Sequence, residues 1–261
     1  MFRPRLVVAD WDETITLEDT IRLVADTAYA AKPRFQPPFS HFSQTYLDAY
    51  DAHNQQFLRL HGKRDSLEKE LEYQHGMRAV EMSSIAEIER LGLFKGLKSA
   101  QFRLQAQHVQ IRPGVEQFLS RCRDQSIPVV ILSINWTKAI IAECLKRLGF
   151  EENDLLRIIV NEFEYTHEVI DGVATELTSG KWSLETNVRT AIDKLEFVKL
   201  LKKKHSDVLY IGDSGTDLLG MLESDKAVVM DRGSALKSLD LLGIKRLAEA
   251  STLLKPQFEA H

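Results

Sequence analysis

Short apolar runs that end in acidic or polar residues are the feature of this sequence that most limits its fold. Such runs are typical of the strands of a parallel sheet, where ligands bind beyond the carboxyl ends of neighbouring strands. If the strands are parallel, their polar endings face one crevice. The runs are 5–10, 128–132 and 208–212, and the polar endings are 10–14, 133–135 and 213–217.

From Arg112 onward, strand patterns alternate with helical patterns. We expect further strands at 156–160 and 226–230, and a hairpin at 163–177 that turns at Asp171-Gly172; we expect a helix at 194–204. This alternation predicts an α/β protein with a Rossmann-like, three-layer α/β/α core, in which a parallel sheet has helices on both faces.

The stretch from Leu17 to His108 has helical rhythm and almost no strand signal. Apolar residues recur at steps of three and four from Leu17 onward, and Thr16 with Asp19 resembles a capping box at the start of this first helix. Further helical patterns cover 46–61, 66–75 and 80–91. We interpret residues 17–108 as an all-helical cap domain, inserted into a core domain made of residues 1–16 and 109–261.

Composition and charge exclude several classes of protein. The 261 residues are 44% hydrophobic and 28% charged, which favours folded domains over disorder. A formal net charge of −4 gives no attraction to nucleic acids or anionic membranes, and every apolar run is too short to cross a bilayer. Asp10 and Asp12 interrupt the first apolar run, so we expect no signal peptide. Cys122 and Cys144 are expected to be reduced core residues, which favours a cytoplasmic protein, with the nucleus as the alternative. The sequence indicates no oligomeric state.

The polar endings bring several carboxylates to one crevice. Four carboxylates cannot share a dry crevice without a cation, because like charges repel strongly at low dielectric. Oxygen ligands favour Mg²⁺, and a nearby hydroxyl and ammonium group suit the oxygens of a phosphate. A carboxylate beside Mg²⁺ can act as a nucleophile. The carboxylates are those of Asp10, Asp12, Asp213 and Asp217, the hydroxyl is that of Ser133, and the ammonium is that of Lys194, expected just before a helix.

The order of these motifs (DxDxT, a strand-end Ser, a helix-start Lys and GDxxxD) resembles the haloacid dehalogenase superfamily of phosphohydrolases. The helical insert between the first two motifs resembles the phosphoserine phosphatase branch. The resemblance implies that Asp10 is the nucleophile that takes the phosphoryl group. It implies that Asp12 protonates the leaving alcohol and then activates water. It further implies that Ser133 and Lys194 hold the phosphoryl oxygens.

The resemblance also implies a metal site and a set of substrate contacts. Asp10, the backbone carbonyl of Asp12 and Asp213 would bind Mg²⁺, with Asp217 supporting that site directly or through water. In phosphoserine phosphatase-like enzymes an acidic residue near the start of the cap meets the substrate. We therefore assign substrate binding to Glu18 or Asp19, together with Thr14, which fixes the turn after the first strand, and Asn135.

The sequence departs from the family pattern at several positions. Glu13 and Asn135 stand where Gly is common, so the first turn must tolerate a side chain, and an amide lies near the phosphate. Lys181 and Lys199 are alternatives to Lys194. Asp217 and Ser133 have a simpler interpretation as residues that cap local structure.

We therefore expect a Mg²⁺-dependent phosphatase that hydrolyses a small phosphomonoester metabolite through an aspartyl-phosphate on Asp10. A phosphotransferase or mutase of the same fold would instead pass the phosphoryl group to another alcohol. A catalytically weak phosphate-binding or scaffold protein is a third interpretation. A dehalogenase is less favoured, because Asp12 has no proton to deliver in that reaction. The substrate itself is not readable from the sequence.

Overall fold

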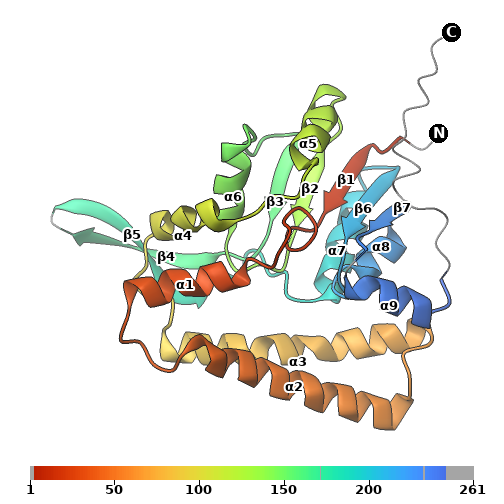
Figure 1. The fold of residues 1–261 in the computed structure, drawn as a ribbon, viewed down its shortest axis with the longest axis horizontal. Coiled ribbons are helices and arrows are strands. Elements are labelled where there is room, and N and C mark those ends of the chain that lie inside the picture. Colours follow the sequence, from red (N-terminus) through yellow and green to blue (C-terminus); the bar gives the residue numbers. More distant parts are fainter. Residues whose placement is uncertain (1–2, 171, 232, 245–261) are drawn as a thin grey trace.

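A five-stranded parallel sheet forms the centre of the computed structural model, which describes residues 3–170, 172–231 and 233–244. The strand order is β3-β2-β1-β6-β7, and every neighbouring pair is parallel (Figure 1). The predicted α/β core is therefore confirmed. The strands are β1 (Leu6–Ala9), β2 (Val129–Leu132), β3 (Leu156–Ile159), β6 (Val208–Gly212) and β7 (Lys226–Val229).

Helices cover both faces of this sheet and bury its strands. Val7 and Ala9 of β1 pack into one hydrophobic cluster with α5 (Val115–Asp124) and α6 (Lys138–Arg147). Leu6 and Val8 point the other way, into a second cluster with α7 (Ala191–Lys202), α8 (Leu218–Glu223) and α9 (Ser234–Leu241). Successive side chains of a strand alternate between faces, so an entirely apolar strand is the pattern that a sheet covered on both faces requires.

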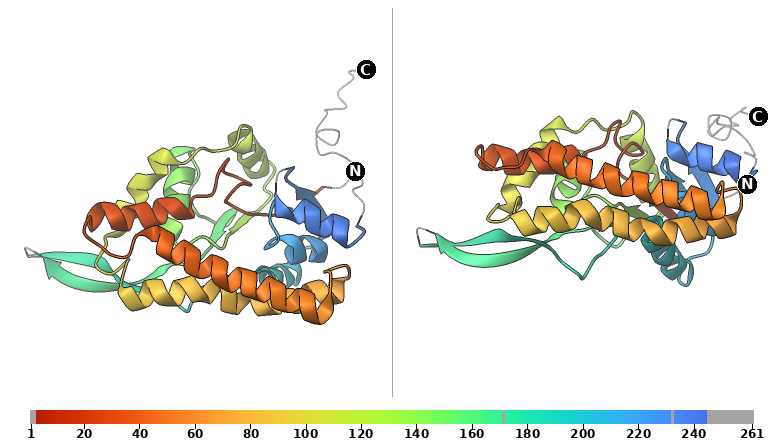
Figure 2. Two further views of the ribbon diagram at one scale, coloured as in Figure 1. Left: turned by 60° about the horizontal axis from the view of Figure 1, so that its bottom comes forward. Right: turned by 90° about the horizontal axis from the view of Figure 1, so that it is seen from below.

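The chain between β1 and β2 is helical. It contains α1 (Ile21–Ala31), α2 (Phe39–His61), α3 (Leu67–Leu91), α4 (Ser99–Leu104) and the 3₁₀ helix η1 (Gln105–His108). The long helices α2 and α3 lie side by side along one side of the sheet core (Figures 1 and 2). The division into a core of residues 1–16 and 109–261 and a cap of residues 17–108 stays a prediction. No helix in the described ranges is both long and apolar enough to span a bilayer.

Several predicted helix bounds were wrong. Helix α1 begins at Ile21 rather than Leu17, and the Thr16 hydroxyl, which donates to the Glu18 carbonyl at 2.7 Å, does not cap it. The patterns at 66–75 and 80–91 belong to the single helix α3. Gly76 joins them, because a Cβ there would lie 2.2 Å from the His53 ring of α2. A helical glycine therefore marks a close contact between α2 and α3 and not a break.

The predicted hairpin exists and is longer than expected. It consists of antiparallel β4 (Phe163–Ile170) and β5 (Val173–Trp182), which project from the body of the molecule (Figure 1). Its base packs against the segment between α3 and α4: the Thr178 backbone N–H donates to the Leu97 carbonyl at 2.8 Å. The Trp182 ring lies 5.6 Å from the rings of both Phe94 and Trp136. Aromatic packing thus joins the hairpin, the helical insert and the loop after β2.

Removing the Trp182 ring should destabilise the protein through this junction. Trp182 is buried, and its indole Nε1–H donates to the Trp136 carbonyl at 2.8 Å. We expect Trp182→Ala to lower the free energy of unfolding in urea by about 3–5 kcal/mol. The control is Val169→Ala on the same hairpin, whose side chain is exposed and should change that energy by less than about 0.5 kcal/mol. Equal stability of the two variants would contradict the assignment of the junction.

Candidate active site

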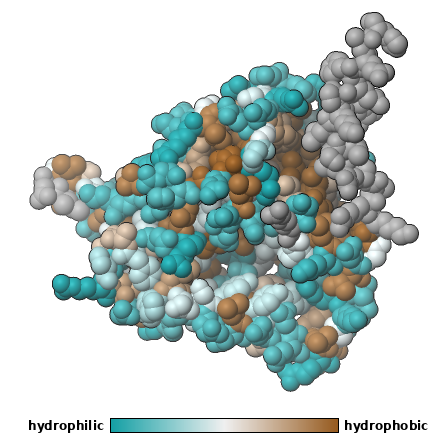
Figure 3. Space-filling view, viewed as in Figure 1, coloured by the Kyte–Doolittle hydropathy of each residue, from teal (hydrophilic) through white to brown (hydrophobic). Residues whose placement is uncertain are grey.

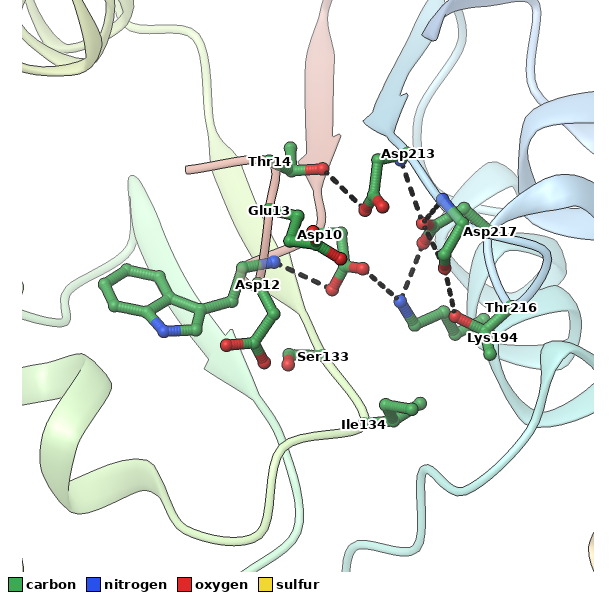
Figure 4. A network of polar contacts seen from close by, with 12 residues as sticks. Asp10, Asp12, Glu13, Thr14, Ser133, Ile134, Lys194, Asp213, Thr216 and Asp217 are labelled. Atoms are coloured by element: carbon green, nitrogen blue, oxygen red, sulfur yellow. Dashed lines mark hydrogen bonds and ion pairs between the residues drawn. The ribbon is translucent and has the colours of Figure 1, made fainter. Parts of the chain in front are cut away.

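Parallel pairing of β1 with β6 brings the first and last acidic motifs together (Figure 4). Ala9 is in register with Ile211, and the Asp10 backbone N–H donates to the Ile211 carbonyl at 2.9 Å. Asp10 therefore lies beside Asp213, which follows β6. Carboxylate oxygens of Asp10, Asp213 and Asp217 all lie within 4.8 Å of one another, and all these side chains are buried.

Lys194 is the cation buried among these acids. Its Nζ lies 2.9 Å from Asp10 Oδ2 and 2.7 Å from Asp217 Oδ1, and the side chain is inaccessible to solvent. Burial alone would lower the pKa of Lys194, but the charges of Asp10 and Asp217 raise it above its ordinary value. Of the predicted lysines, the structure brings Lys194 to the acids, whereas Lys199 is exposed and pairs with Glu196.

The position of Lys194 is set by the start of α7. The helix begins at Ala191, three residues before the expected start, so Lys194 lies in its first turn. Thr190 and Asp193 form a capping box: the Thr190 hydroxyl accepts a hydrogen bond from the Asp193 backbone N–H, and the Asp193 carboxylate accepts from the Thr190 backbone N–H. Asp193 thus fixes the helix start and does not join the acids of the site.

Asp217 is occupied by protein donors on both oxygens. Its Oδ1 accepts from Lys194 Nζ and from the Tyr210 hydroxyl at 2.8 Å. Its Oδ2 accepts from the backbone N–H groups of Asp213 and Ser214 and from the Ser214 hydroxyl, at 3.0–3.2 Å. Burial raises the pKa of Asp217, but Lys194 outweighs this effect and lowers it below its ordinary value. Asp217 occupies the N-cap position of α8, as the simpler interpretation expected, but its carboxylate makes no capping hydrogen bond to that helix.

Asp12 is held on the other side of Asp10 by donors from two segments. The backbone N–H and the hydroxyl of Thr20 donate to Asp12 Oδ1 at 2.7 and 2.6 Å. The Asn135 amide donates to Asp12 Oδ2 at 2.9 Å. Burial raises the pKa of Asp12, and the hydrogen bonds from Thr20 and Asn135 oppose this rise. The Asn135 amide, which we expected at the phosphate, is thus engaged by the acid beside it.

The turn after β1 accommodates Glu13 in a conformation that favours glycine. Glu13 has a φ of 54°, and its side chain is exposed, so it fills no space that the turn needs. Arg112 stabilises the turn by donating to the backbone carbonyls of Glu13 and Thr14. The Thr14 hydroxyl donates to Asp213 Oδ1 at 3.2 Å. The Thr14 side chain therefore links the first and last motifs.

The remaining predicted residues lie at different places. Ser133 is fully buried after β2, and its hydroxyl oxygen accepts from the Asn135 backbone N–H at 3.0 Å. Asp19 is exposed at the edge of a pocket, where surrounding groups desolvate it and Asp12 repels it, so that its pKa is raised to about 6. Glu18 is exposed and contributes its backbone carbonyl to Thr16.

Sequence reasoning missed Thr20 and Tyr210. Each donates a hydrogen bond to an acid of the site, Thr20 to Asp12 and Tyr210 to Asp217. Thr20 lies close to the first acidic motif in the sequence, but only the fold shows that its hydroxyl donates to Asp12. Tyr210 lies within an apolar strand, where a phenol is a common core residue, so the sequence has no signal for its role.

The charge of the site favours a divalent cation. Burial and then the neighbouring Asp217 raise the pKa of Asp213 to about 7. Burial and Asp217 also raise the pKa of Asp10 well above its ordinary value, even though Lys194 opposes this effect. One ammonium group therefore does not balance the clustered carboxylates. Their oxygens are hard ligands of the kind that Mg²⁺ prefers, so the donor set fits that ion.

Comparisons with known proteins identify a family and two relatives. A family model for haloacid dehalogenase-like hydrolases matches residues 4–225. Cold tolerance protein 1 of Saccharomyces cerevisiae is 28% identical over 242 residues, which cover 83% of this chain and 75% of that protein. A CTO1 family protein of Schizosaccharomyces pombe is 27% identical over 249 residues, covering 91% of this chain and 85% of that protein.

Solved structures share the fold at low sequence identity. A phosphoserine phosphatase, solved as an analogue of its phospho-aspartyl intermediate, superposes with a TM-score of 0.54 at 15% identity. The match covers 97% of this chain and 98% of that one. Cytosolic 5'-nucleotidase IIIB bound to cytidine gives a TM-score of 0.53 at 13% identity, covering 92% of this chain and 76% of that one.

Replacing Lys194 by Met should destabilise the protein most at high pH. Without the ammonium group, the buried Asp10 and Asp217 carboxylates lack their partner, and the loss should be about 3–5 kcal/mol at about pH 7.5. Their folded-state pKa values would then exceed the unfolded ones, so protonation restores part of the stability as the pH falls toward about 5.5. Urea unfolding in EDTA, at a series of pH values, measures this difference.

The matched control is Lys199→Met, which removes an exposed lysine of the same helix. Its ion pair with Glu196 is exposed, so the free energy of unfolding should change by less than about 0.5 kcal/mol at either pH. A Lys194→Met deficit that widens toward acid pH, or no deficit at all, would show that this lysine does not balance the acids.

Proposed function

The chain belongs to the haloacid dehalogenase-like hydrolase family, and we propose that it is a Mg²⁺-dependent phosphatase that hydrolyses a small phosphomonoester through an aspartyl-phosphate on Asp10. The observation that carries this proposal is the position of Asp10. Its carboxylate is buried between the Lys194 ammonium group and the Asp213 carboxylate, and Asp12 stands beside it. The proposed nucleophile, a lysine ammonium group and a second acid therefore lie next to one another.

In the first step, a carboxylate oxygen of Asp10 attacks phosphorus. The bond from phosphorus to the leaving oxygen breaks, and Asp12 gives its proton to that oxygen, so the alcohol departs neutral. The raised pKa of Asp12 favours the protonated form that this step needs. The hydrogen bonds from Thr20 and Asn135 hold the carboxyl group in place while it carries the proton.

In the second step, water releases the phosphoryl group. Asp12, now a carboxylate, takes a proton from a water molecule whose oxygen attacks phosphorus, and the bond to Asp10 breaks to yield inorganic phosphate. Asp12 is protonated again and Asp10 is free, so the cycle closes.

Ser133 and Lys194 are suited to hold the phosphoryl oxygens. The Ser133 oxygen accepts from the Asn135 backbone N–H, which leaves the hydroxyl hydrogen available to donate. The Lys194 ammonium group already contacts Asp10 Oδ2, so it lies beside any group that Asp10 attacks. In the proposed reaction, both residues would supply donors where negative charge develops.

Asp10, Asp213 and the backbone carbonyl of Asp12 would hold Mg²⁺. When bound, the ion offsets the repulsion between the Asp10 carboxylate and an incoming phosphate. The oxygens of Asp217 accept from Lys194, from Tyr210 and from the loop that precedes it. Asp217 would therefore support the site by fixing these partners. We further propose that the substrate is a small molecule, because the pocket beside the site has a volume of about 450 Å³.

Asp10→Asn should abolish phosphate release without unfolding the protein. An amide is a poor nucleophile of the same shape, so kcat should fall by roughly 10³-fold or more. Inorganic phosphate is measured against a panel of phosphorylated metabolites, with and without Mg²⁺, and this product also separates hydrolysis from transfer to another alcohol. Circular dichroism follows the fold.

Asp124→Asn is the control, because that carboxylate is exposed and away from the acids of the site. It should release phosphate at the wild-type rate. Near-normal turnover by Asp10→Asn would remove Asp10 as the nucleophile, and a wild-type protein inactive on every phosphomonoester would count against the phosphatase itself.

A further inference from the structure

A pocket of about 450 Å³ opens beside the candidate active site. Three of its lining residues are chain neighbours of site residues: Ile134 follows Ser133, Thr216 precedes Asp217, and Asp19 precedes Thr20. Its other walls come from α1, α2, α3 and the segment before α7. Figure 3 shows the molecule hollowed between the sheet core and the α2–α3 pair. A leaving group attached to a phosphate at Asp10 would extend into this pocket.

Aromatic side chains form one wall of the pocket. The Phe39 ring lies 6.2 Å from the Trp136 ring and 6.4 Å from the Phe42 ring. Tyr46 and Ile85 continue the same wall. Such a wall favours a flat apolar group over a short polar chain, because it offers contact area and few hydrogen bonds.

Arg189 lines the same pocket, and its buried guanidinium group has no ion-pair partner. The residue is 4% exposed, and its Nη1 has no hydrogen-bond partner. Within residues 3–170, 172–231 and 233–244, its guanidinium makes neither a hydrogen bond nor an ion pair. Its guanidinium carbon lies 5.0 Å from the centre of the Trp182 ring. A buried cation without an ion pair is costly, so this position favours an external anion.

Nearby carboxylates are engaged with other groups. The Asp193 carboxylate contacts Arg78 at 2.9 Å and accepts backbone N–H bonds at the start of α7. Glu81 lines the pocket and accepts from the Tyr46 hydroxyl at 3.3 Å, and burial raises its pKa to about 7. Glu89 accepts from the Trp182 backbone N–H at 3.1 Å. None of these three carboxylates forms an ion pair with Arg189, so their charges act on its guanidinium only from beyond ion-pair distance.

We propose that Arg189 binds a carboxylate of the substrate, so that the substrate is a phosphomonoester whose leaving alcohol carries a flat apolar body and an acid group. A carboxylate fits better than a second phosphate, because Arg189 carries one positive charge and the other arginine of the pocket, Arg22, is already paired with Asp26 at 2.8 Å. The hydrolysis of such a substrate rests on the proposed phosphatase function, whereas the binding of its carboxylate by Arg189 does not.

Phosphonates that cannot be hydrolysed test the binding separately from turnover. Titration calorimetry with Mg²⁺ compares benzylphosphonate with its 3-carboxy and 4-carboxy derivatives. We expect at least one carboxylated compound to bind wild-type protein about tenfold or more tightly than benzylphosphonate. Arg189→Gln should erase this preference and leave the affinity for benzylphosphonate within about twofold. Arg189→Lys should reduce the preference for the carboxylated compounds without erasing it. This variant tests the proposal if Arg189→Gln does not fold.

Arg78→Gln is the matched control. Arg78 is an exposed arginine near the same segment, ion-paired with Asp193, and its replacement should preserve the preference for the carboxylate. Equal wild-type affinity for all three phosphonates, no binding of any of them, or a preference that survives in both Arg189 variants would overturn the proposal. A loss of thermal stability in Arg189→Gln with the preference intact would assign the residue a structural role.

Release of phosphate from phenyl phosphate and its carboxylated derivatives tests the reaction. If the carboxylated phosphonates bind through Arg189 and no ester is hydrolysed, the proposed function fails while this inference stands. If phenyl phosphate is hydrolysed and its carboxylated derivatives gain nothing in kcat/KM, the proposed function stands and this inference fails.

Discussion

The ion pairs of Lys194 with Asp10 and Asp217 are the interactions on which the rest of the site depends. A buried ammonium group is stable only beside negative charge, and buried carboxylates are stable only beside positive charge. Lys194 meets both needs, but one cation cannot balance the cluster that also includes Asp213. We propose that the remaining charge imbalance favours binding of a divalent ion and of a substrate held against it.

A second imbalance lies only a few residues away in the chain. Arg189 precedes α7, the helix that carries Lys194, and its guanidinium is buried without an ion pair. The two features have opposite sign: the acids outnumber their single cation, and Arg189 makes no ion pair. A Mg²⁺ ion and a substrate with an acid group would balance both. The hairpin contributes here as well, since Trp182 packs against Arg189 and the Trp136 loop.

The sequence predicted the parts of the site that depend on local pattern and failed where distant segments meet. The strand ends at Asp10, Ser133 and Asp213 follow from apolar runs, and parallel pairing then places them at one edge. The start of α1 was wrong, because Asp12 holds the Thr20 backbone and delays the helix to Ile21. The pairing of α2 with α3 through Gly76 was invisible to helical periodicity.

The same reason explains the missed side chains. Tyr210 is a strand residue whose hydroxyl reaches Asp217, and Arg189 is an arginine whose isolation appears only once its neighbours are known. The family resemblance implied roles for Asp10, Asp12 and Lys194, yet it could not indicate that Asn135 is engaged by Asp12. The position of a residue along a strand can be predicted from the local sequence. The hydrogen-bond partners of a buried polar group depend on the whole fold.

A crystal structure with Mn²⁺ in place of Mg²⁺, with anomalous scattering to locate the metal, tests the central claim most directly. We expect one metal peak bound by carboxylate oxygens of both Asp10 and Asp213, with Lys194 still on Asp217. A saturating Mn²⁺ concentration that gives no peak there, or a peak that Asp10 does not contact, would contradict it.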